Sequence, residues 1–148
     1  MDNYLDVVKK EKILEIENVE KCNKTLERYG MYLSEADIKN IVSCRNEALS
    51  STHRLEIGNG ILEKIIIEFC DSQFIEKDEF VDTISELIEI FYFYKNETKD
   101  LISDDELIDF MKKSFEQDAG GSVEYLKDTL LAGFAKAVLG GRKYEWDW

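Results

Sequence analysis

The 148-residue chain has no proline, one histidine and three cysteines, and each of these low counts limits the folds or the functional sites that the chain can form. Because proline breaks helices from within, its absence favours long helices joined by short turns. A lone histidine, His53, argues against a histidine general base, a His-rich zinc site and a two-histidine di-iron bundle. No stretch approaches the roughly 20 apolar residues that cross a membrane. We therefore expect a soluble, all-helical domain without membrane association.

The three cysteines, Cys22, Cys44 and Cys70, are an odd number at wide spacing. This pattern suits free thiols in a reducing compartment better than a disulfide framework. The first residues lack both the basic start and the apolar stretch of a secretion signal. We expect a cytoplasmic protein whose cysteines serve as small core side chains.

Positive charge is also scarce, most of all in the middle of the chain. The net charge is −13, and residues 68–109, with 14 acidic and 3 basic side chains, hold −11 of it. Such a field repels nucleic acid and anionic lipid, so direct binding to nucleic acid is not expected. A basic protein surface is the natural partner, although acidic faces can also serve solubility alone. The pattern favours no particular oligomeric state.

Apolar residues at helical spacing predict a single helical domain over residues 1–141, followed by a tail over 142–148. Ser34, Ser103 and Ser122 each stand where a helix needs an N-cap, and glycines follow several expected helix ends. The predicted architecture is all-α, with about six helices that cover approximately residues 13–28, 34–50, 61–70, 78–96, 103–119 and 122–139.

Three segments leave alternatives open. The run Ile61–Cys70 contains three consecutive isoleucines that suit a strand, but its length and its Glu and Lys content favour a helix. Residues 55–57 could form a short extended piece, and the half of the fourth helix around 91–94 should be the most enclosed part of the domain. In the tail, Trp146 and Trp148 either dock on their own domain, which we favour, or anchor a partner.

Arg45 is the most informative single residue, because it lies on the apolar stripe of the second predicted helix between Val42 and Leu49. A buried guanidinium needs acceptors, so we expect an Asp or Glu from the middle third to reach it. An interhelical ion pair that fixes helix register is the favoured interpretation, and recognition of an anion is the alternative.

No residue pattern indicates a catalytic site. The chain has no Cys-x-x-Cys, phosphate-binding glycine loop, serine nucleophile elbow or calcium-loop pattern, so we predict no catalytic residues, no metal and no cofactor. A small-ligand or enzyme site, if present, should lie where helix ends meet the central loop. Its candidate residues are Arg45, His53, Arg54, Glu56, Asn96, Glu97, Asp104, Asp105 and Glu106.

The cluster Asp104–Glu106 stands in the first turn of a predicted helix, where the helix dipole favours negative charge. That location explains the cluster without a ligand. A divalent-cation site shared with Asp100 or Asp109 is the minor alternative, because adjacent helical residues rarely converge on one ion.

Several short segments together carry a resemblance to a known family. They are Arg45–Leu49, Arg54–Gly58, Phe69–Ser72, Phe91–Glu97, Ser103–Ile108 and Gly121–Leu126. In their order and spacing they resemble a small family of uncharacterised bacterial proteins, found mainly in Firmicutes, whose function is unknown. The resemblance covers roughly residues 20–130. It implies a bacterial cytoplasmic protein of about this length and implies no activity.

Three functions are compatible with these features. The leading hypothesis is an acidic protein-binding or scaffold module that meets a basic surface through residues 68–109. The second is a small-ligand receptor or enzyme built on the nine polar candidates, and the third is a nucleic-acid mimic that presents carboxylates in place of phosphates.

Overall fold

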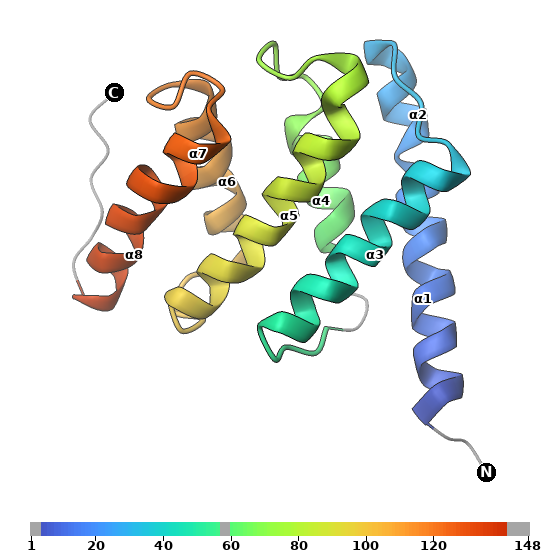
Figure 1. Ribbon diagram of the computed structural model, residues 1–148, viewed down its shortest axis with the longest axis horizontal. Coiled ribbons are helices and arrows are strands. Elements are labelled where there is room, and N and C mark those ends of the chain that lie inside the picture. Colours follow the sequence, from blue (N-terminus) through green and yellow to red (C-terminus); the bar gives the residue numbers. More distant parts are fainter. Residues whose placement is uncertain (1–3, 57–59, 142–148) are drawn as a thin grey trace.

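The computed structural model of the protein describes residues 4–56 and 60–141. Within these residues the chain forms six helical segments and no strand, which confirms the predicted fold class (Figure 1). The tail over residues 142–148 lies outside the described residues, and so does the predicted docking of Trp146 and Trp148.

The first segment consists of α1 (Tyr4–Lys21), α2 (Asn23–Leu26) and a 3₁₀ turn, η1 (Glu27–Tyr29). It begins well before Ile13, where the sequence placed its start, because no proline or glycine interrupts the preceding residues. The segment ends at Gly30, whose φ of 76° is the left-handed conformation that glycine adopts without strain.

A buried asparagine marks the break between α1 and α2. The Asn23 side chain accepts a hydrogen bond from the Leu33 amide at 2.7 Å and donates one to the Leu33 carbonyl at 3.0 Å. Both groups would otherwise be buried without partners, at a cost of about 1–3 kcal/mol each. Asn23 therefore joins the first helical segment to the chain that leads into the next one.

The second and fourth segments are the long helices α3 (Glu35–Ser51) and α5 (Phe80–Glu97), the latter preceded by η2 (Lys77–Glu79). Ser34 caps α3 as predicted, with a complete capping box: its hydroxyl accepts from the Asp37 amide, and the Asp37 carboxylate accepts from the Ser34 amide. α3 and α5 lie side by side in Figure 1.

Two shorter helices, α4 (Ile61–Phe69) and α6 (Asp104–Glu116), form the third and fifth segments. The ambiguous isoleucine run is thus a helix, as predicted, and residues 54–56 before it are neither helix nor strand. Ser103 caps α6, but its box is incomplete because the Glu106 carboxylate binds the Ser103 hydroxyl and not its amide.

The last segment is less regular than the single helix that the sequence predicted. Ser122 caps it, and it runs through α7 (Val123–Tyr125), a π-helical turn η3 (Leu126–Leu131) and α8 (Ala132–Leu139). The Tyr94 hydroxyl of α5 donates a 2.5 Å hydrogen bond to the carbonyl of Lys127, inside the π-helical turn. Such turns are rare and are common near functional sites.

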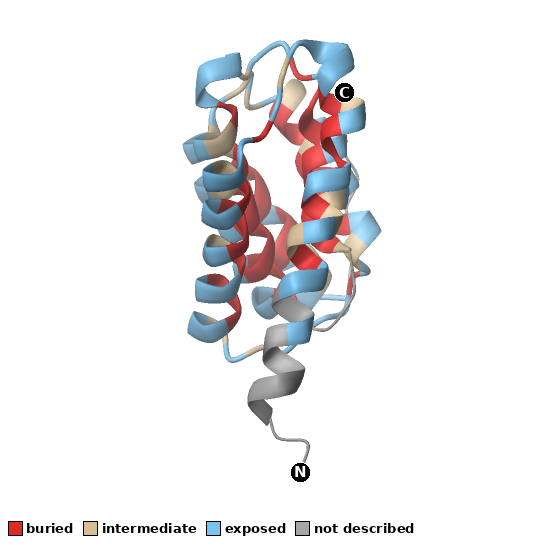
Figure 2. Ribbon diagram, turned by 90° about the vertical axis from the view of Figure 1, so that its right-hand side faces the viewer, coloured by how far each residue is buried: buried red, intermediate tan, exposed pale blue. Residues whose placement is uncertain are grey.

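The helices form two layers that enclose one core. α3, α5 and the α7–α8 segment lie in front in Figure 1, and α4 and α6 lie behind them. Figure 2 shows the buried residues facing inward between these layers. Large aromatic side chains fill the space between the layers: Phe69, Phe91, Tyr92, Phe110, Phe115 and Phe134. The rings of Phe110 and Phe134 stack with their centroids 4.1 Å apart.

The predicted enclosure of α5 is correct for three of its four consecutive aromatic residues. Phe91, Tyr92 and Tyr94 are buried, but Phe93 is 42% exposed. Four consecutive helical residues point in four directions, about 100° apart, so α5 could enclose all of them only if the protein covered it completely.

Candidate functional site

Arg45 is buried on the apolar face of α3, as its position on the stripe predicted. Its guanidinium lies 3.7 Å from a carboxylate oxygen of Glu15 and donates a 2.9 Å hydrogen bond to the Glu56 carbonyl. Glu15 belongs to α1 and not to the acidic middle third, from which we had expected the partner. The contact joins α1, α3 and the loop after α3, so it acts as an interhelical link.

Tyr92 lies beside this buried cluster. Burial raises the pKa of the Tyr92 phenol far above its ordinary value; the carboxylate of Glu56 raises it further, and Arg45 opposes the shift. A tyrosine with this pKa stays protonated and cannot serve as a base near neutral pH. Tyr92 therefore cannot act as a general base in this cluster, although the cluster contains charged groups.

Arg54 ties the loop after α3 to the end of α5. Its guanidinium forms a bidentate contact with Asp100, at 2.7 and 3.1 Å, and donates to Asn96 at 2.8 Å. Asn96 in turn donates to the Thr52 carbonyl at 2.8 Å. The arginine holds the pKa of Asp100 below its usual range, mainly through these hydrogen bonds.

Lys95 makes a second link at the same end of α5. Its buried ammonium donates to the Ile102 carbonyl at 2.7 Å and lies 2.9 Å from Asp104 and 3.7 Å from Asp100. Asp104 therefore helps neutralise a buried lysine. The loop between α5 and α6 is held by these contacts against both helices.

The nine predicted candidates consequently fall into separate groups. The structure brings Arg54 and Asn96 together, places Asp104 beside them through Lys95, and joins Arg45 to Glu56 in the neighbouring cluster. His53 is exposed with a φ of 57°, and Glu97 is exposed on the last turn of α5. The remaining two, Asp105 and Glu106, face a different part of the surface.

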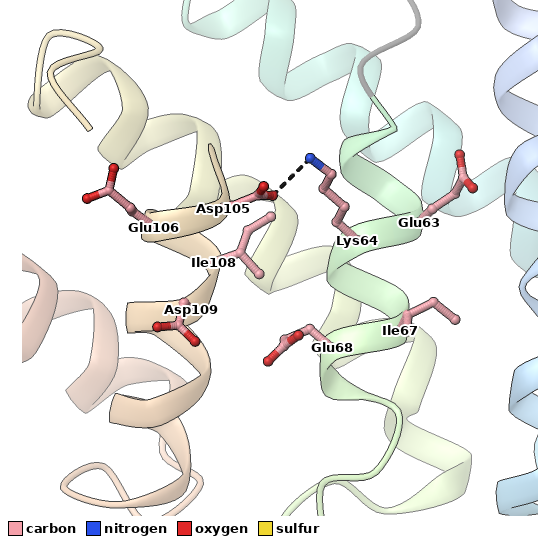
Figure 3. A pocket seen from close by; sticks show the side chains of 8 residues that line it. All are labelled: Glu63, Lys64, Ile67, Glu68, Asp105, Glu106, Ile108 and Asp109. Carbon is pink, nitrogen blue, oxygen red and sulfur yellow. Dashed lines mark ion pairs between the residues drawn. The ribbon is translucent and has the colours of Figure 1, made fainter. Parts of the chain in front are cut away.

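That surface is a groove of about 670 Å³ between α4 and α6. We call it the α4–α6 groove, and its lining residues are Glu63, Lys64, Ile67, Glu68, Asp105, Glu106, Ile108 and Asp109. Figure 3 shows that Lys64, Glu68 and Ile108 point into the space between the two helices. Glu63 and Ile67 lie on the side of α4 that faces away from α6.

The α4–α6 groove is acidic, with five carboxylates and one ammonium group. A 2.9 Å ion pair between Lys64 and Asp105 crosses it, and this contact raises the pKa of Lys64. Both side chains are largely exposed, so the pair contributes about 0–1 kcal/mol. Ile67, which is 40% exposed, adds apolar surface on the side of α4 that faces away from α6. The groove and the adjoining face of α4 thus combine acidic and apolar surface.

Sequence reasoning named Asp105 and Glu106 of this groove, and Asp109 in the cation-site alternative, but it missed the α4 side. The missing signal was the run Ile65–Ile67: three consecutive residues on a helix point about 100° apart, so on a helix with one buried face we would expect one of these isoleucines to be exposed. Ile65 and Ile66 are buried and Ile67 is not. An exposed isoleucine between Lys64 and Glu68 would have indicated an amphipathic surface.

Over residues 4–56 and 60–141, the thiols and carboxylates form no metal-binding arrangement. In the part of the chain that the structure describes, no three His, Cys, Asp or Glu side chains are grouped to hold a metal ion. The cysteines are free thiols, and burial raises the pKa of Cys22 to about 12 and that of Cys44 to about 11. Thiols of this kind are poor nucleophiles at neutral pH. Over the same residues, no helix is both long and apolar enough to cross a membrane.

Comparison with known proteins identifies a family but no activity. No curated protein and no solved structure matches the chain. Residues 18–144 match a family described as a family of unknown function (DUF6323), which extends the predicted resemblance beyond residue 130 to include α8. The chain therefore belongs to this family of unknown function.

Proposed function

We propose that the protein is a binding or scaffold module that receives a basic, amphipathic segment of another protein in the α4–α6 groove. The observation that carries the proposal is that carboxylates line both sides of the groove, while the exposed Ile67 extends its apolar lining over the adjoining face of α4. A helix whose two faces differ in polarity fits such a surface, because its apolar side chains can contact Ile67 while its cations meet the carboxylates of the groove.

Charge supports this choice of partner. Asp105, Glu106 and Asp109 line one side of the groove and Glu68 the other, so the partner's lysines or arginines meet carboxylates on both sides. The net charge of −13 adds long-range attraction that speeds encounter with a basic partner and weakens with salt. The same negative charge would repel a nucleic acid that bound directly.

The internal contacts of the other candidates favour this function over a small-ligand site. Arg45 donates to the Glu56 carbonyl and lies against Glu15, while Arg54 binds Asp100 and Asn96. A guanidinium held by internal acceptors in this way has to exchange them before it can bind an anionic ligand. In the α4–α6 groove, Asp105 pairs with Lys64 and Asp109 with Lys113, but both pairs are exposed and cost little to exchange.

We also propose that the protein acts in the cytoplasm of a bacterium, mainly within Firmicutes, as the resemblance implies. Cys22, Cys44 and Cys70 support a reducing compartment because all three are free thiols. Detection of the endogenous protein in the soluble fraction of such a cell tests this part of the proposal.

The binding proposal is tested with a fluorescent synthetic peptide of leucine and lysine at helical spacing. We expect fluorescence anisotropy to show saturable binding that weakens as salt rises. Glu68→Lys with Asp109→Lys reverses two exposed charges in the groove and should weaken binding about tenfold, which corresponds to roughly 1.4 kcal/mol.

A matched variant separates the groove from overall charge. Glu27→Lys with Asp118→Lys reverses two exposed acidic residues that do not line the groove, and gives the same net charge. We expect this control to weaken binding by about twofold at most at physiological salt. Equal losses in the two double variants would contradict a specific groove, as would binding that is indifferent to salt.

A further inference from the structure

A second hollow lies on the opposite layer of the molecule and combines acidic side chains with an exposed aromatic ring. It has a volume of about 400 Å³ and lies between α3, α5 and the π-helical turn η3. Its wall on α5 contains Glu89 and Phe93, which are one helical turn apart and share a face, and α3 contributes Glu47. We call it the Phe93 hollow.

A cation already occupies the Phe93 hollow. The ammonium group of Lys127 lies over the Phe93 ring, 5.8 Å from its centre, which is within the range of a cation–π contact. Lys127 comes from η3, whose carbonyl at this residue accepts the hydrogen bond from Tyr94. That hydrogen bond holds the turn against α5 next to Phe93, so the backbone from which the lysine side chain extends is fixed.

The acidic wall continues beyond the hollow along α5. A neighbouring hollow of about 240 Å³ shares Glu89 and Lys127 and adds Glu86 and Asp128. Glu86, Glu89 and Phe93 stand at positions i, i+3 and i+7 of α5, along one side of the helix. Carboxylates therefore extend from the exposed ring in a line that a second cation of the same partner could follow.

We propose that the Phe93 hollow is a binding site for an arginine side chain of a basic partner segment, and that Lys127 is the internal cation that this arginine displaces. A guanidinium stacks flat on an aromatic ring and has five donors for nearby carboxylates, whereas an ammonium acts as a compact, strongly hydrated charge. The site selects arginine over lysine because Phe93 supplies the flat face and Glu47 and Glu89 supply the acceptors. This site is independent of the α4–α6 groove, because α4 and α6 contribute none of its lining residues.

The test compares oligo-arginine and oligo-lysine peptides of equal length by fluorescence anisotropy at physiological salt. The wild-type protein should bind the arginine peptide more tightly. Phe93→Leu keeps apolar volume at a half-exposed position but removes the aromatic face, so it should abolish this preference while the protein stays folded by circular dichroism.

Removal of the internal cation gives the sharper result. Lys127→Ala frees the Phe93 ring and should strengthen binding of the arginine peptide about threefold more than Lys136→Ala, an exposed lysine of α8 that lines neither hollow. Equal effects of the two lysine variants would overturn the proposal. Retention of the arginine preference in Phe93→Leu would overturn it as well.

The result is separable from the proposal for the α4–α6 groove. Peptide-induced shifts of backbone amide resonances should appear at Glu89 and Phe93 for the arginine site. They should appear at Glu68 and Asp109 for the α4–α6 groove. If the double variant Glu68→Lys with Asp109→Lys leaves the arginine preference intact, the two sites are distinct, and failure of one leaves the other standing.

Discussion

The charged side chains of Arg45 and Glu15 are buried in the cluster that they form with Glu56, which we call the Arg45 cluster, whereas those of the α4–α6 groove lie at the surface. Arg45 and Glu15 are both more than nine-tenths buried, and their contact links three parts of the chain. The α4–α6 groove leaves five carboxylates near solvent with one exposed lysine among them. A buried charge costs free energy unless a fixed partner compensates for its lost hydration, whereas a charge exposed to solvent costs almost none. Charge in the first region thus stabilises the fold, whereas charge in the second lies at the surface.

The largest expected effect comes from Arg45→Ala. This change leaves the Glu15 carboxylate buried without its guanidinium and deprives the Glu56 carbonyl of a donor. We expect a loss of about 3–5 kcal/mol in the free energy of unfolding, the usual cost of breaking a buried ion pair from one side. Urea unfolding followed by circular dichroism measures it.

The double variant Glu15→Leu with Arg45→Met is the control, because it removes both charges and fills similar volume. Its stability should return to within about 1–2 kcal/mol of the wild type. If the double variant is as unstable as Arg45→Ala, the stability of this region depends on shape and not on the balance of buried charge.

A smaller effect is expected where a charge pair is only partly exposed, at Arg54 and Asp100. The pKa of Asp100 is lowered, mainly by its hydrogen bonds to Arg54, so the folded state binds this proton more weakly than the unfolded state. The pair therefore stabilises the fold above the ordinary aspartate pKa of about 3.9, and the contribution is lost as pH falls through the lower folded value.

The variant Asp100→Asn tests the direction of this pH dependence. Asparagine tolerates the left-handed backbone at this position, where φ is 57°, so the change acts mainly on charge. We expect a loss of about 0.5–1 kcal/mol at neutral pH that shrinks toward zero in strong acid. Asp118→Asn, at an exposed loop position, is the control and should show no such pH dependence. A difference that grows in acid would contradict the assignment.

The sequence predicted the elements of this fold because helix signals are local. Ser34 and Ser122 cap helices where expected, and the stripe that contains Arg45 is buried. The need of Arg45 for a partner also followed from its position. The identity of that partner did not, because Glu15 reaches Arg45 through the packing of α1 against α3, which no spacing along the chain reveals.

The candidate site was less predictable because neighbouring residues on a helix face different ways. The sequence grouped Asp104, Asp105 and Glu106 as one cluster, yet successive side chains point about 100° apart. Asp104 turns to the buried Lys95 and Asp105 to Lys64 across the α4–α6 groove. Asp104 therefore stabilises the fold, while Asp105 and Glu106 line the groove, and this division depends on the positions of α4 and α5.

The smallest expected effect on stability comes from the groove variant Glu68→Lys with Asp109→Lys. Both side chains are exposed, so burial adds little to the cost of reversing them. Asp109 loses its 3.0 Å pair with Lys113, worth about 0.3–0.5 kcal/mol, while the reversal relieves repulsion among the remaining carboxylates. The free energy of unfolding should therefore stay within about 0.5 kcal/mol of the wild type, although we expect the same variant to weaken peptide binding. A loss above about 2 kcal/mol would show that the groove, like the Arg45 cluster, uses its charge to hold the fold.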